Sequence, residues 1–297
     1  MNSKNINIFI QSHLNLFNTS NVIKVCCIGH KIVLFSNNYY NKMNKRNDKL
    51  AFCFLTYTNL SQPKLWNIFF RNSSEYNIYI HNKFNLSDTT FNKYRIRKPI
   101  PTKYGHISLV KATLLLFKTA FDADKNNEYF ILLSDKCIPL YDFNTIYKKI
   151  IKQNSSIISC FTGNIDRYDN LKNMSFFDRD KFMKQDQWMI LKRNDVDFFI
   201  NNDYTNIFGN NIFAADEHYF VNICNKFNIN YIKDFITYVN KYEKSDNDIY
   251  RPEPKTYSKL KNSVIDKIKR IYPNILFMRK IARECAIPTK HINNITT

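Results

Sequence analysis

The sequence predicts an α/β fold: a mostly parallel central sheet flanked by helices, in a single domain. Short apolar runs of strand length alternate with segments whose apolar residues recur at helical spacing. The runs are apolar at nearly every position, as in parallel strands that are buried on both faces. No Gly- or Pro-rich linker divides the 297-residue chain, which holds only 4 Gly and 8 Pro. One α/β domain therefore fits both the pattern and the length.

The first half of the chain alternates regularly between predicted strands and helices. Pro63 lies near the first turn of the first helix, where the missing N–H of proline costs least. Strands joined by helical crossovers run parallel, with right-handed connections, so this order predicts the sheet. The predicted strands are 51–57, 76–81, 129–134 and 155–161, and the helices between them are 65–70, 108–121 and 143–151.

The second half of the chain has a looser pattern. Asp216 and Glu217 favour a helix start, because acids in a first turn complement the helix dipole. The expected elements are a basic loop at 162–184, a strand at 187–191, helices at 194–201 and 216–225, a strand at 231–239, a charged loop at 241–256, a basic helix from 258 and a further segment at 275–285. Residues 1–48 are interpreted as an N-terminal preamble with one helix and one or two strands, and residues 49–290 as the α/β domain.

The net charge of +19, from 44 Lys and Arg against 25 Asp and Glu, favours anionic partners. Nucleic acid, lipid headgroups and phosphorylated small molecules all fit this charge. A coding bias toward Asn, Lys, Ile, Tyr and Phe fits it equally well. The basic residues are spread along the chain, whereas a nucleic-acid-binding face would cluster them with aromatic residues.

Glycine and cysteine patterns exclude several kinds of site. The four glycines stand alone, so the sequence has neither a Walker loop nor a G-x-G-x-x-G turn. The 7 cysteines form no C-x-x-C pair and lie mostly in apolar runs, which indicates buried reduced thiols. The sequence shows no signal peptide, and its most apolar early stretch, 22–35, is too charged to span a membrane. We expect a soluble, cytoplasmic protein without a transmembrane segment, whose charge leaves peripheral membrane contact open.

Polar residues follow three of the predicted parallel strands, at the edge where open α/β sheets bind ligands. Any loop is polar, so this position alone does not separate a functional role from a structural one. The residues are Thr56 and Tyr57, then His81, Asn82 and Lys83, then Ser134, Asp135, Lys136 and Cys137.

The sequence does not predict a metal site. A D-x-D pair after a strand is the usual Mn²⁺ ligand of enzymes that use sugar nucleotides, and none of the four pairs here follows a strand. Asp122 and Asp124 precede the strand at 129–134, at the opposite edge of the sheet. The six histidines form no H-x-x-x-H pair. No metal or other cofactor is expected.

Several of these segments resemble, in the same order, the core-2/I-branching β-1,6-N-acetylglucosaminyltransferase family (glycosyltransferase family 14), including its plant branch. The resemblance covers about residues 50–285. Its most specific parts are the Leu-Leu-Ser and Cys-Ile-Pro-Leu block within 130–143 and the acidic triplet 216–218. Other matching segments are 54–56, 65–70, 76–81, 103–105, 108–113, 187–188 and 277–280.

The resemblance implies a GT-A fold, with a nucleotide-binding half at about 49–160 and an acceptor-binding half at about 161–290. It implies an inverting, metal-independent transfer of a sugar, GlcNAc above all, from a UDP-sugar to a hydroxyl of a glycan or glycoprotein. Related enzymes use UDP-xylose or UDP-glucuronate on a similar framework, so the donor stays open. Relatives are Golgi membrane proteins with an amino-terminal anchor that this sequence does not show.

The resemblance also suggests roles for single residues. Glu217 matches the catalytic base, and a carboxylate is well suited to take a proton from an acceptor hydroxyl. Residues 183–186 depart from the family, because they lack the glycine that many relatives have there, and this alters the acceptor loop. The expected donor-binding residues are Lys280, Arg279, Arg251, His81, Ser134 and Thr56, and the expected acceptor-binding residues are Trp188, Asp135 and Lys184.

Two alternatives to a glycosyltransferase stay open at this point. The first is a basic nucleic-acid-binding protein, favoured by net charge and aromatic content, which would bind with a steep salt dependence. The second is a catalytically silent member of the same fold that only binds glycans. Intact Glu217, Arg279 and Lys280 argue against the second alternative.

Overall fold

The computed structural model describes residues 23–28, 31–36, 48–84, 89–162, 165–240 and 253–296. The chain divides into two compact units, residues 1–47 and residues 48–297. In the first unit, β1 (Ile23–Ile28) and β2 (Lys31–Ser36) form an antiparallel hairpin. The predicted helix of the preamble lies outside the described residues.

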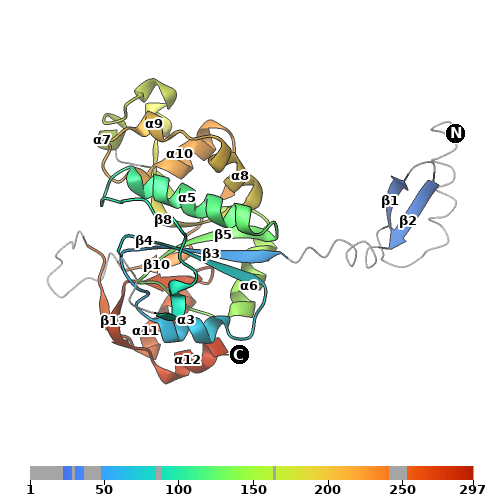
Figure 1. The fold of residues 1–297 in the computed structure, drawn as a ribbon, viewed down its shortest axis with the longest axis vertical. Helices are drawn as coiled ribbons and strands as arrows, with labels where there is room; N and C mark the ends of the chain where they lie inside the picture. The colour runs from blue at the N-terminus through green and yellow to red at the C-terminus, as the bar shows by residue number, and fades with distance from the viewer. Residues whose placement is uncertain are drawn as a thin grey trace. The chain divides into compact units, whose positions relative to one another are not determined.

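A six-stranded sheet with the order β4-β3-β5-β8-β7-β9 organises the second unit (Figure 1). Strand β3 pairs in parallel with β4 and β5, and β7 pairs in parallel with β9. Strand β8 pairs antiparallel with both β5 and β7, so it alone runs against the other five. The strands are β3 (Lys49–Thr56), β4 (Tyr76–Asn82), β5 (Asn127–Ser134), β7 (Ser156–Thr162), β8 (Met183–Lys192) and β9 (Tyr231–Ile232).

Helices cover both faces of this sheet. Helix α5 (Ser108–Ala123) lies across β3, β4 and β5, where its Phe117 packs edge-on against Phe130 (Figure 1). On the opposite face Phe52 of β3 contacts the rings of Trp66 and Phe143. These two residues belong to α3 (Pro63–Phe70) and α6 (Phe143–Gln153). The side chains of a strand alternate between faces, so a fully apolar β3 can support both helix layers at once.

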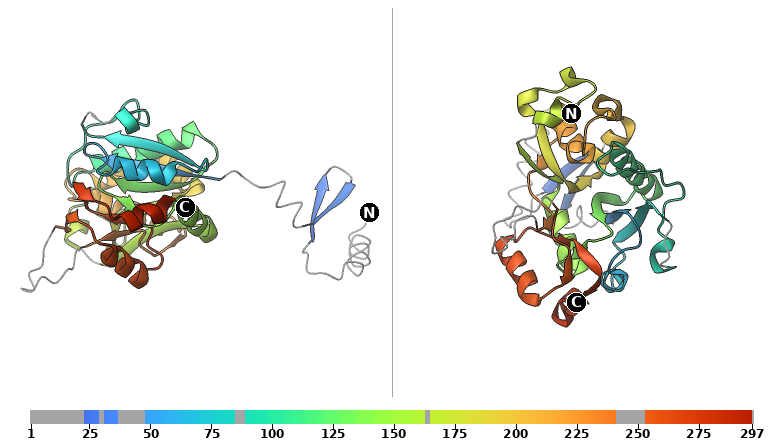
Figure 2. Two further views of the ribbon diagram at one scale, coloured as in Figure 1. Left: turned by 90° about the horizontal axis from the view of Figure 1, so that it is seen from below. Right: turned by 90° about the vertical axis from the view of Figure 1, so that its left-hand side faces the viewer.

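The C-terminal part of the chain adds two small sheets. In the first, β12 (Phe277–Arg279) lies between β10 (Thr237–Val239) and β6 (Ile138–Pro139). In the second, β11 (Tyr257–Lys259) pairs with β13 (Ile281–Ala286). Helix α12 (Thr289–Thr296) packs against α3, so the end of the chain returns to the first helix of the second unit's described residues (Figure 2). The remaining helices are α4 (Thr89–Asn92), α7 (Ile165–Tyr168), α8 (Arg193–Asn201), α9 (Thr205–Phe208), α10 (Tyr219–Lys226) and α11 (Asn262–Ile271), and the 3₁₀ turns are η1 (Met174–Phe176), η2 (Arg179–Lys181) and η3 (Ala215–Glu217).

The predicted α/β architecture with a mostly parallel sheet is confirmed, and three predicted elements are corrected. The helix expected at 216–225 is two elements, because η3 ends at Glu217 and α10 begins only at Tyr219. The two acids therefore lie outside the first turn of the α-helix, and that turn contains no acidic residue. The strand expected at 231–239 is split between β9 and β10, which lie in different sheets. The strand expected at 187–191 begins earlier, at Met183, inside the predicted loop.

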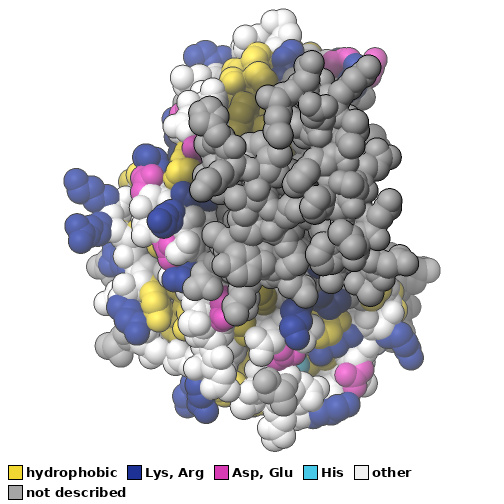
Figure 3. Space-filling model, turned by 90° about the vertical axis from the view of Figure 1, so that its right-hand side faces the viewer, with side chains coloured by type: hydrophobic (Ala, Val, Ile, Leu, Met, Phe, Trp, Pro, Cys, Tyr) yellow, Lys and Arg dark blue, Asp and Glu magenta, His cyan; other side chains and the backbone are white. Residues whose placement is uncertain are grey.

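Five of the predicted thiols are buried and free: Cys53, Cys137, Cys160, Cys224 and Cys285. Burial raises the pKa of each one for which a shift is resolved, Cys53 most plainly. Within the described ranges, no helix is both long and apolar enough to cross a membrane. On the face drawn in Figure 3, Lys and Arg side chains of the described residues stand in separate small groups with acids between them. The described residues of that face form no single basic stripe.

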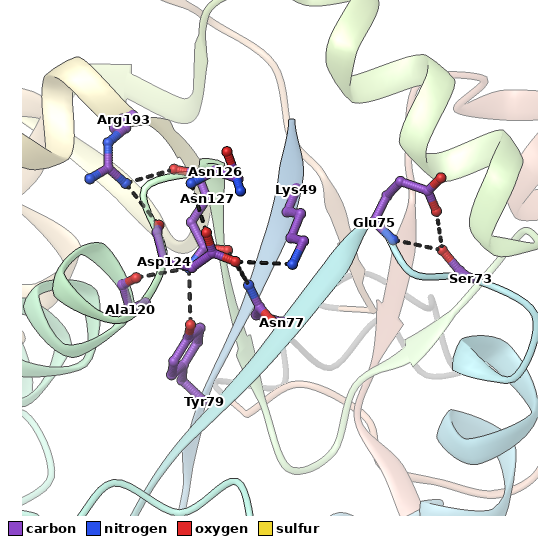
Figure 4. Close-up of polar contacts among 10 residues, drawn as sticks. All are labelled: Lys49, Ser73, Glu75, Asn77, Tyr79, Ala120, Asp124, Asn126, Asn127 and Arg193. Carbon is purple, nitrogen blue, oxygen red and sulfur yellow. Dashed lines mark hydrogen bonds and ion pairs between the residues drawn. The ribbon is translucent and has the colours of Figure 1, made fainter. Parts of the chain in front are cut away.

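Asp124 organises a polar network at the amino-terminal edge of the sheet (Figure 4). Its carboxylate lies 3.0 Å from Nζ of Lys49 and accepts a hydrogen bond of 2.9 Å from Nδ2 of Asn77. It also accepts one from the backbone N–H of Asn126 at 2.9 Å. Asp122 pairs separately with Lys118 at 3.0 Å. Both acids of this D-x-D pair are therefore engaged in structural contacts, at the edge of the sheet where the sequence places them.

The contacts of Asp124 predict an acid-dependent contribution to stability. Burial alone would raise the pKa of Asp124, but the hydrogen bonds from Asn126, Lys49 and Asn77 outweigh it and lower the pKa. Asp124→Asn should lower the free energy of unfolding by about 1–3 kcal/mol at pH 7, because buried donors lose a charged acceptor. A carboxyl whose pKa is lowered by folding stabilises the folded state at every pH above its unfolded-state pKa, about 4. This stabilisation is lost as the pH falls below that value.

Urea unfolding between pH 7 and pH 3 measures this effect. The difference between Asp124→Asn and the parent should hold down to about pH 4 and narrow below it. Asp266→Asn is the matched control, since Asp266 makes an exposed ion pair with Lys290 and should change stability little. Equal losses in both variants would contradict the assignment.

Candidate active site

The three polar strand ends predicted from the sequence meet at the carboxyl edge of β3, β4 and β5. In the sheet register, Leu55 lies opposite both His81 and Ser134. The hydroxyl of Thr56 donates to the carbonyl oxygen of His81 at 3.4 Å, and both side chains are buried. The Nε2 atom of His81 accepts the N–H of Ile100 at 3.1 Å. Burial lowers the pKa of His81, so the neutral ring acts here as a hydrogen-bond acceptor that holds the Ile100 segment.

The turn after β5 receives the C-terminal part of the chain. The hydroxyl of Ser134 lies 3.3 Å from Sγ of Cys137 and accepts the N–H of Lys136 at 3.2 Å, which closes the turn. Strand β12 pairs antiparallel with β6, with Met278 opposite Ile138. This register carries the next residue, Arg279, back along the chain toward the turn. Residues far apart in the sequence are thereby joined at one strand end.

Arg279 is a half-buried cation at this junction. Its guanidinium carbon lies 4.3 Å from the ring centroid of Trp188, so the two side chains form a cation–π contact. Burial lowers the pKa of Arg279, while Cys137, Asp135 and Asp186 act in the opposite direction. Among the described residues, Nε of Arg279 has no hydrogen-bond partner. The guanidinium therefore retains a donor for a further acceptor.

Lys280 and Lys136 bring further positive charge to the same edge. The pKa of Lys280 is lowered by burial and next by the charge of Arg279, with a smaller effect from Lys136. The N–H of Ile281 donates to the carbonyl oxygen of Lys136 at 3.0 Å, which ties the two segments together. Asp135, half-buried nearby, has a pKa raised by burial and lowered in part by Lys136 and Arg279. Like charges held this close favour a bound anion.

Glu217 is the accessible carboxylate on the other side of the site. Its Oε2 atom lies 2.9 Å from Nζ of Lys184, and the two side chains are 35% and 25% exposed. Nζ of Lys184 also lies 6.0 Å from the ring centroid of Phe161 on the neighbouring strand β7. The carboxylate is thus oriented by one lysine but remains open to solvent.

The two neighbours of Glu217 are buried and differ from it chemically. Burial, and next the charge of Glu217, raise the pKa of Asp216 to about 7. His218 stacks on the ring of Phe182 at 5.4 Å, and its Nδ1 lies 3.0 Å from the carbonyl oxygen of Ala214. Burial lowers the pKa of His218 to about 4, so the ring is neutral at physiological pH. Only the middle member of the triplet presents a charged group to a ligand.

Strand β8 connects the two sides of the site. Lys184 pairs with Glu217, Trp188 lies against the guanidinium of Arg279, and the charge of Asp186 acts to raise the pKa of Arg279. The pairing of β8 with β7 shifts register between Gln185 and Met189, within this stretch.

Strand β8 also anchors the segment that carries Glu217. Oε1 of Gln185 accepts the N–H of Val221 at 2.6 Å. Asn222 accepts the N–H of Met183 at 2.8 Å and donates to the carbonyl oxygens of Met183 at 2.8 Å and His218 at 2.7 Å. Both amides are buried. Helix α10 is therefore held on β8 by directional hydrogen bonds, which fix the height of Glu217 above the strand.

A loop contact that the sequence did not reveal supports Glu217 from the other side. The N–H of Ala214 donates to the carbonyl oxygen of Gly105 at 2.7 Å, and the N–H of Glu217 donates to the carbonyl oxygen of Ala214 at 2.9 Å. Phe213, 44% exposed, packs edge-on against Tyr104, which is 84% exposed. These two rings form an open apolar surface beside the carboxylate. The only sequence signal was Gly105 itself, an isolated glycine in a chain poor in glycine.

The predicted site residues fall into two groups. Thr56, Ser134, Asp135, Arg279 and Lys280 meet at the ends of β3 and β5, and Lys184 meets Glu217. Trp188, predicted on the acceptor side, is buried under Arg279 instead, and Asp135 also lies on the Arg279 side. Arg251 lies outside the described residues. The roles assigned to all of these residues stay predictions.

The arrangement offers cations that can hold an anion and a carboxylate that can accept a proton, both in contact with β8. Among the described residues, no group of three or more His, Cys, Asp or Glu side chains converges as metal ligands would. Asp186 and Trp188 had no predicted role beside Arg279, because nothing in the sequence showed that β8 runs antiparallel between β5 and β7.

The backbone of Gly105 generates a testable prediction. Gly105 has φ +65°, and a Cβ atom there would lie 2.3 Å from Cε2 of Phe213. Gly105→Ala should therefore destabilise the protein by about 1–2 kcal/mol through backbone strain alone, with a further loss from the displaced ring. Urea unfolding measures both terms if the substitution is also made in a Phe213→Ala background. In the Phe213→Ala background, Gly105→Ala should lose only the stability that comes from backbone strain, because the ring is gone. A Gly105→Ala variant as stable as the parent would refute this geometry.

Comparison with known proteins places the chain in a family. A profile of the Core-2/I-Branching enzyme family matches residues 50–271. A rice protein (Oryza sativa subsp. japonica) named "Glycosyltransferase BC10" is 26% identical over 166 residues, which are 53% of this chain and 41% of the relative. The chain thus aligns with less than half of that relative's length. The family profile covers most of the domain, and the chain therefore belongs to the Core-2/I-Branching enzyme family.

Proposed function

We propose that this protein is an inverting glycosyltransferase that transfers a sugar, GlcNAc in the first instance, from a UDP-sugar to a hydroxyl of a glycan. Family membership and the name of the rice relative support a glycosyltransferase. The observation that carries the proposal is the arrangement along β8: a cation cluster around Arg279 at Trp188 and the partly exposed carboxylate of Glu217 at Lys184.

The cation cluster is the proposed binding site of the donor diphosphate. A diphosphate carries several negative charges and many acceptor oxygens, and guanidinium groups bind it through charge-assisted hydrogen bonds. Arg279 offers a buried donor atom without a partner among the described residues, and Lys280 adds a half-buried ammonium. The cluster also neutralises the charge that develops on the diphosphate as the sugar leaves. Direct charge neutralisation by side chains lets the transfer proceed without a metal ion.

Glu217 is the proposed general base. A carboxylate accepts on two oxygens, so Glu217 can keep Lys184 on Oε2 and accept an acceptor hydroxyl on Oε1. In the transfer, the hydroxyl oxygen forms a bond to the anomeric carbon while the bond from that carbon to the diphosphate oxygen breaks. The hydroxyl proton goes to Glu217, and UDP leaves with the bonding electron pair. Attack opposite the leaving group inverts the anomeric configuration.

The neighbouring side chains suit this role of Glu217. Asp216, with its pKa raised to about 7, is largely protonated below neutral pH and adds little repulsion. His218 stays neutral and buried, so it does not compete for the proton. Tyr104, which is largely exposed, presents a ring face on which the apolar face of a sugar can stack.

UDP release from a panel of UDP-sugars and glycan acceptors, in the presence of EDTA, tests the proposal. We expect turnover with UDP-GlcNAc that EDTA does not reduce. Glu217→Gln preserves the shape of the side chain and removes its basicity, so kcat should fall by about 10²–10⁴-fold while the affinity for UDP hardly changes.

Glu75→Gln is the matched control for that variant. It makes the same chemical change at the opposite edge of the sheet, where Glu75 accepts hydrogen bonds from Ser73 and Ser74 (Figure 4). Its kcat should stay close to that of the parent. Turnover that survives within about tenfold in Glu217→Gln would remove Glu217 as the base, and activity restored only by Mn²⁺ would overturn the metal-independent mechanism.

The donor site makes a separate prediction about binding. Arg279→Gln combined with Lys280→Met should weaken UDP binding by about 100-fold, because two charge-assisted contacts are lost. Isothermal titration calorimetry with UDP measures this. Lys259→Met, an exposed lysine on the adjacent strand β11, is the control and should bind UDP as the parent does. Unchanged UDP affinity in a folded double variant would rule out the assignment.

A further inference from the structure

A groove outside the candidate active site runs along the open edge of the main sheet. Strand β4 is the edge strand, and two adjoining hollows of about 490 and 390 Å³ lie against it. They share Ile78, Tyr79 and Tyr94 as lining residues. Their sizes are typical of sites that bind small molecules or short segments of polymers.

The groove exists because a short chain segment covers only part of the β4 edge. The N–H of Ile80 donates to the carbonyl oxygen of Tyr94, and the N–H of Ile96 donates to the carbonyl oxygen of Ile80, both at 2.9 Å. This single parallel bridge at Arg95 is as far as the pairing extends among the described residues. Below it the edge stays open beside Tyr76 and Ile78, and helix α5 closes the other side through Leu115 and Thr119.

The lining of the groove is strongly basic. Four cations occur within six residues, and the lining residues given by the structure include no Asp or Glu. Tyr79 and Tyr94 contribute half-buried rings to the same lining. Glu75, which follows Ser73 and Ser74 at the lower end, already accepts hydrogen bonds from both serines (Figure 4). The cations are Lys93, Arg95, Arg97 and Lys98.

The same chain segment joins the groove to the candidate active site. Beyond the basic residues, Ile100 donates its N–H to His81 at the end of β4. Gly105 then accepts the N–H of Ala214, two hydrogen bonds away from Glu217. From Ile78 to the end of β4 at Asn82 is only about 13 Å at the rise of a strand. Residues 93–105 therefore connect the groove with the loop that supports Glu217.

We propose that this groove binds an anionic stretch of the glycan acceptor, a segment whose sugars carry carboxylate or sulfate groups. The inference rests on the proposed glycosyltransferase function, because the acceptor is then itself a carbohydrate chain. The cations bind the acidic groups, and the tyrosine rings provide faces for the sugars between them. Nucleic acid fits less well, since it requires a longer continuous basic surface than these two hollows provide.

Direct binding to the full-length protein tests the inference. The probes are a heparin hexasaccharide for sulfate, an oligogalacturonate hexamer for carboxylate, maltohexaose as the neutral sugar and a single-stranded oligonucleotide of equal charge. One variant combines Lys93→Gln, Arg97→Gln and Lys98→Gln. All three side chains are exposed, and none belongs to the hydrophobic core. The matched control combines Lys148→Gln, Lys152→Gln and Lys267→Gln, which removes the same charge from exposed sites on α6 and α11.

We expect at least one acidic hexasaccharide to bind the parent and to bind the groove variant at least tenfold more weakly, with the control variant unchanged. Which of the two acidic sugars binds identifies the anionic group. Equal losses of affinity in the groove variant and the control variant would show an effect of net charge alone and would overturn the inference. Binding of maltohexaose as tight as that of the acidic sugars would also overturn it. Tighter binding of the oligonucleotide, lost in the groove variant, would also overturn it by making the groove a nucleic-acid site.

The binding experiment and the turnover assay fail independently. Binding is measured without any UDP-sugar. If the groove binds no acidic sugar, the expected turnover of the parent and its expected loss in Glu217→Gln are not affected. Conversely, acidic-sugar binding that persists in a protein inactive with every UDP-sugar would refute the proposed function and remove the acceptor role from the groove.

Discussion

The antiparallel insertion of β8 is the constraint on which the rest of the site depends. Five strands of the main sheet run one way, and β8 runs against them between β5 and β7. Its side chains serve two purposes at once. Lys184 and Trp188 reach Glu217 and Arg279, while Gln185, between them in the sequence, holds α10. The position of β8 therefore fixes both sides of the site together.

The cation cluster holds charge that the described residues compensate only in part. Arg279 is half-buried, and its buried Nε atom has no partner among the described residues. Burial and next the charge of Arg279 lower the pKa of Lys280. The Trp188 ring and the nearby acids offset only part of the cost of burial. A bound anion would stabilise such an arrangement.

Local sequence patterns predicted most of the sheet and its helices, because apolar periodicity is set by burial within each element. The strands around Phe52 and Phe130 and the helix over 108–121 are examples. Patterns could not show that the segment from Met183 pairs antiparallel, nor that Trp188 lies under Arg279, because both depend on contacts distant in sequence. The break between Glu217 and Tyr219 was missed for a related reason. The acids looked like a helix start, but Ala214 at φ +57° directs a 3₁₀ turn there instead.

For the C-terminal residues, the structure gives information that the family comparison does not. The family profile stops at residue 271, before Arg279 and Lys280, so it does not bear on them. The structure brings them to the site through the pairing of β12 with β6, which places Met278 opposite Ile138 just after the turn that ends β5. Helix α12 closes this arrangement against α3. The cation side of the site therefore depends on a segment beyond the family match. The contact of Arg279 with Trp188 and its charge interaction with Asp135 are the physical reasons to include that segment.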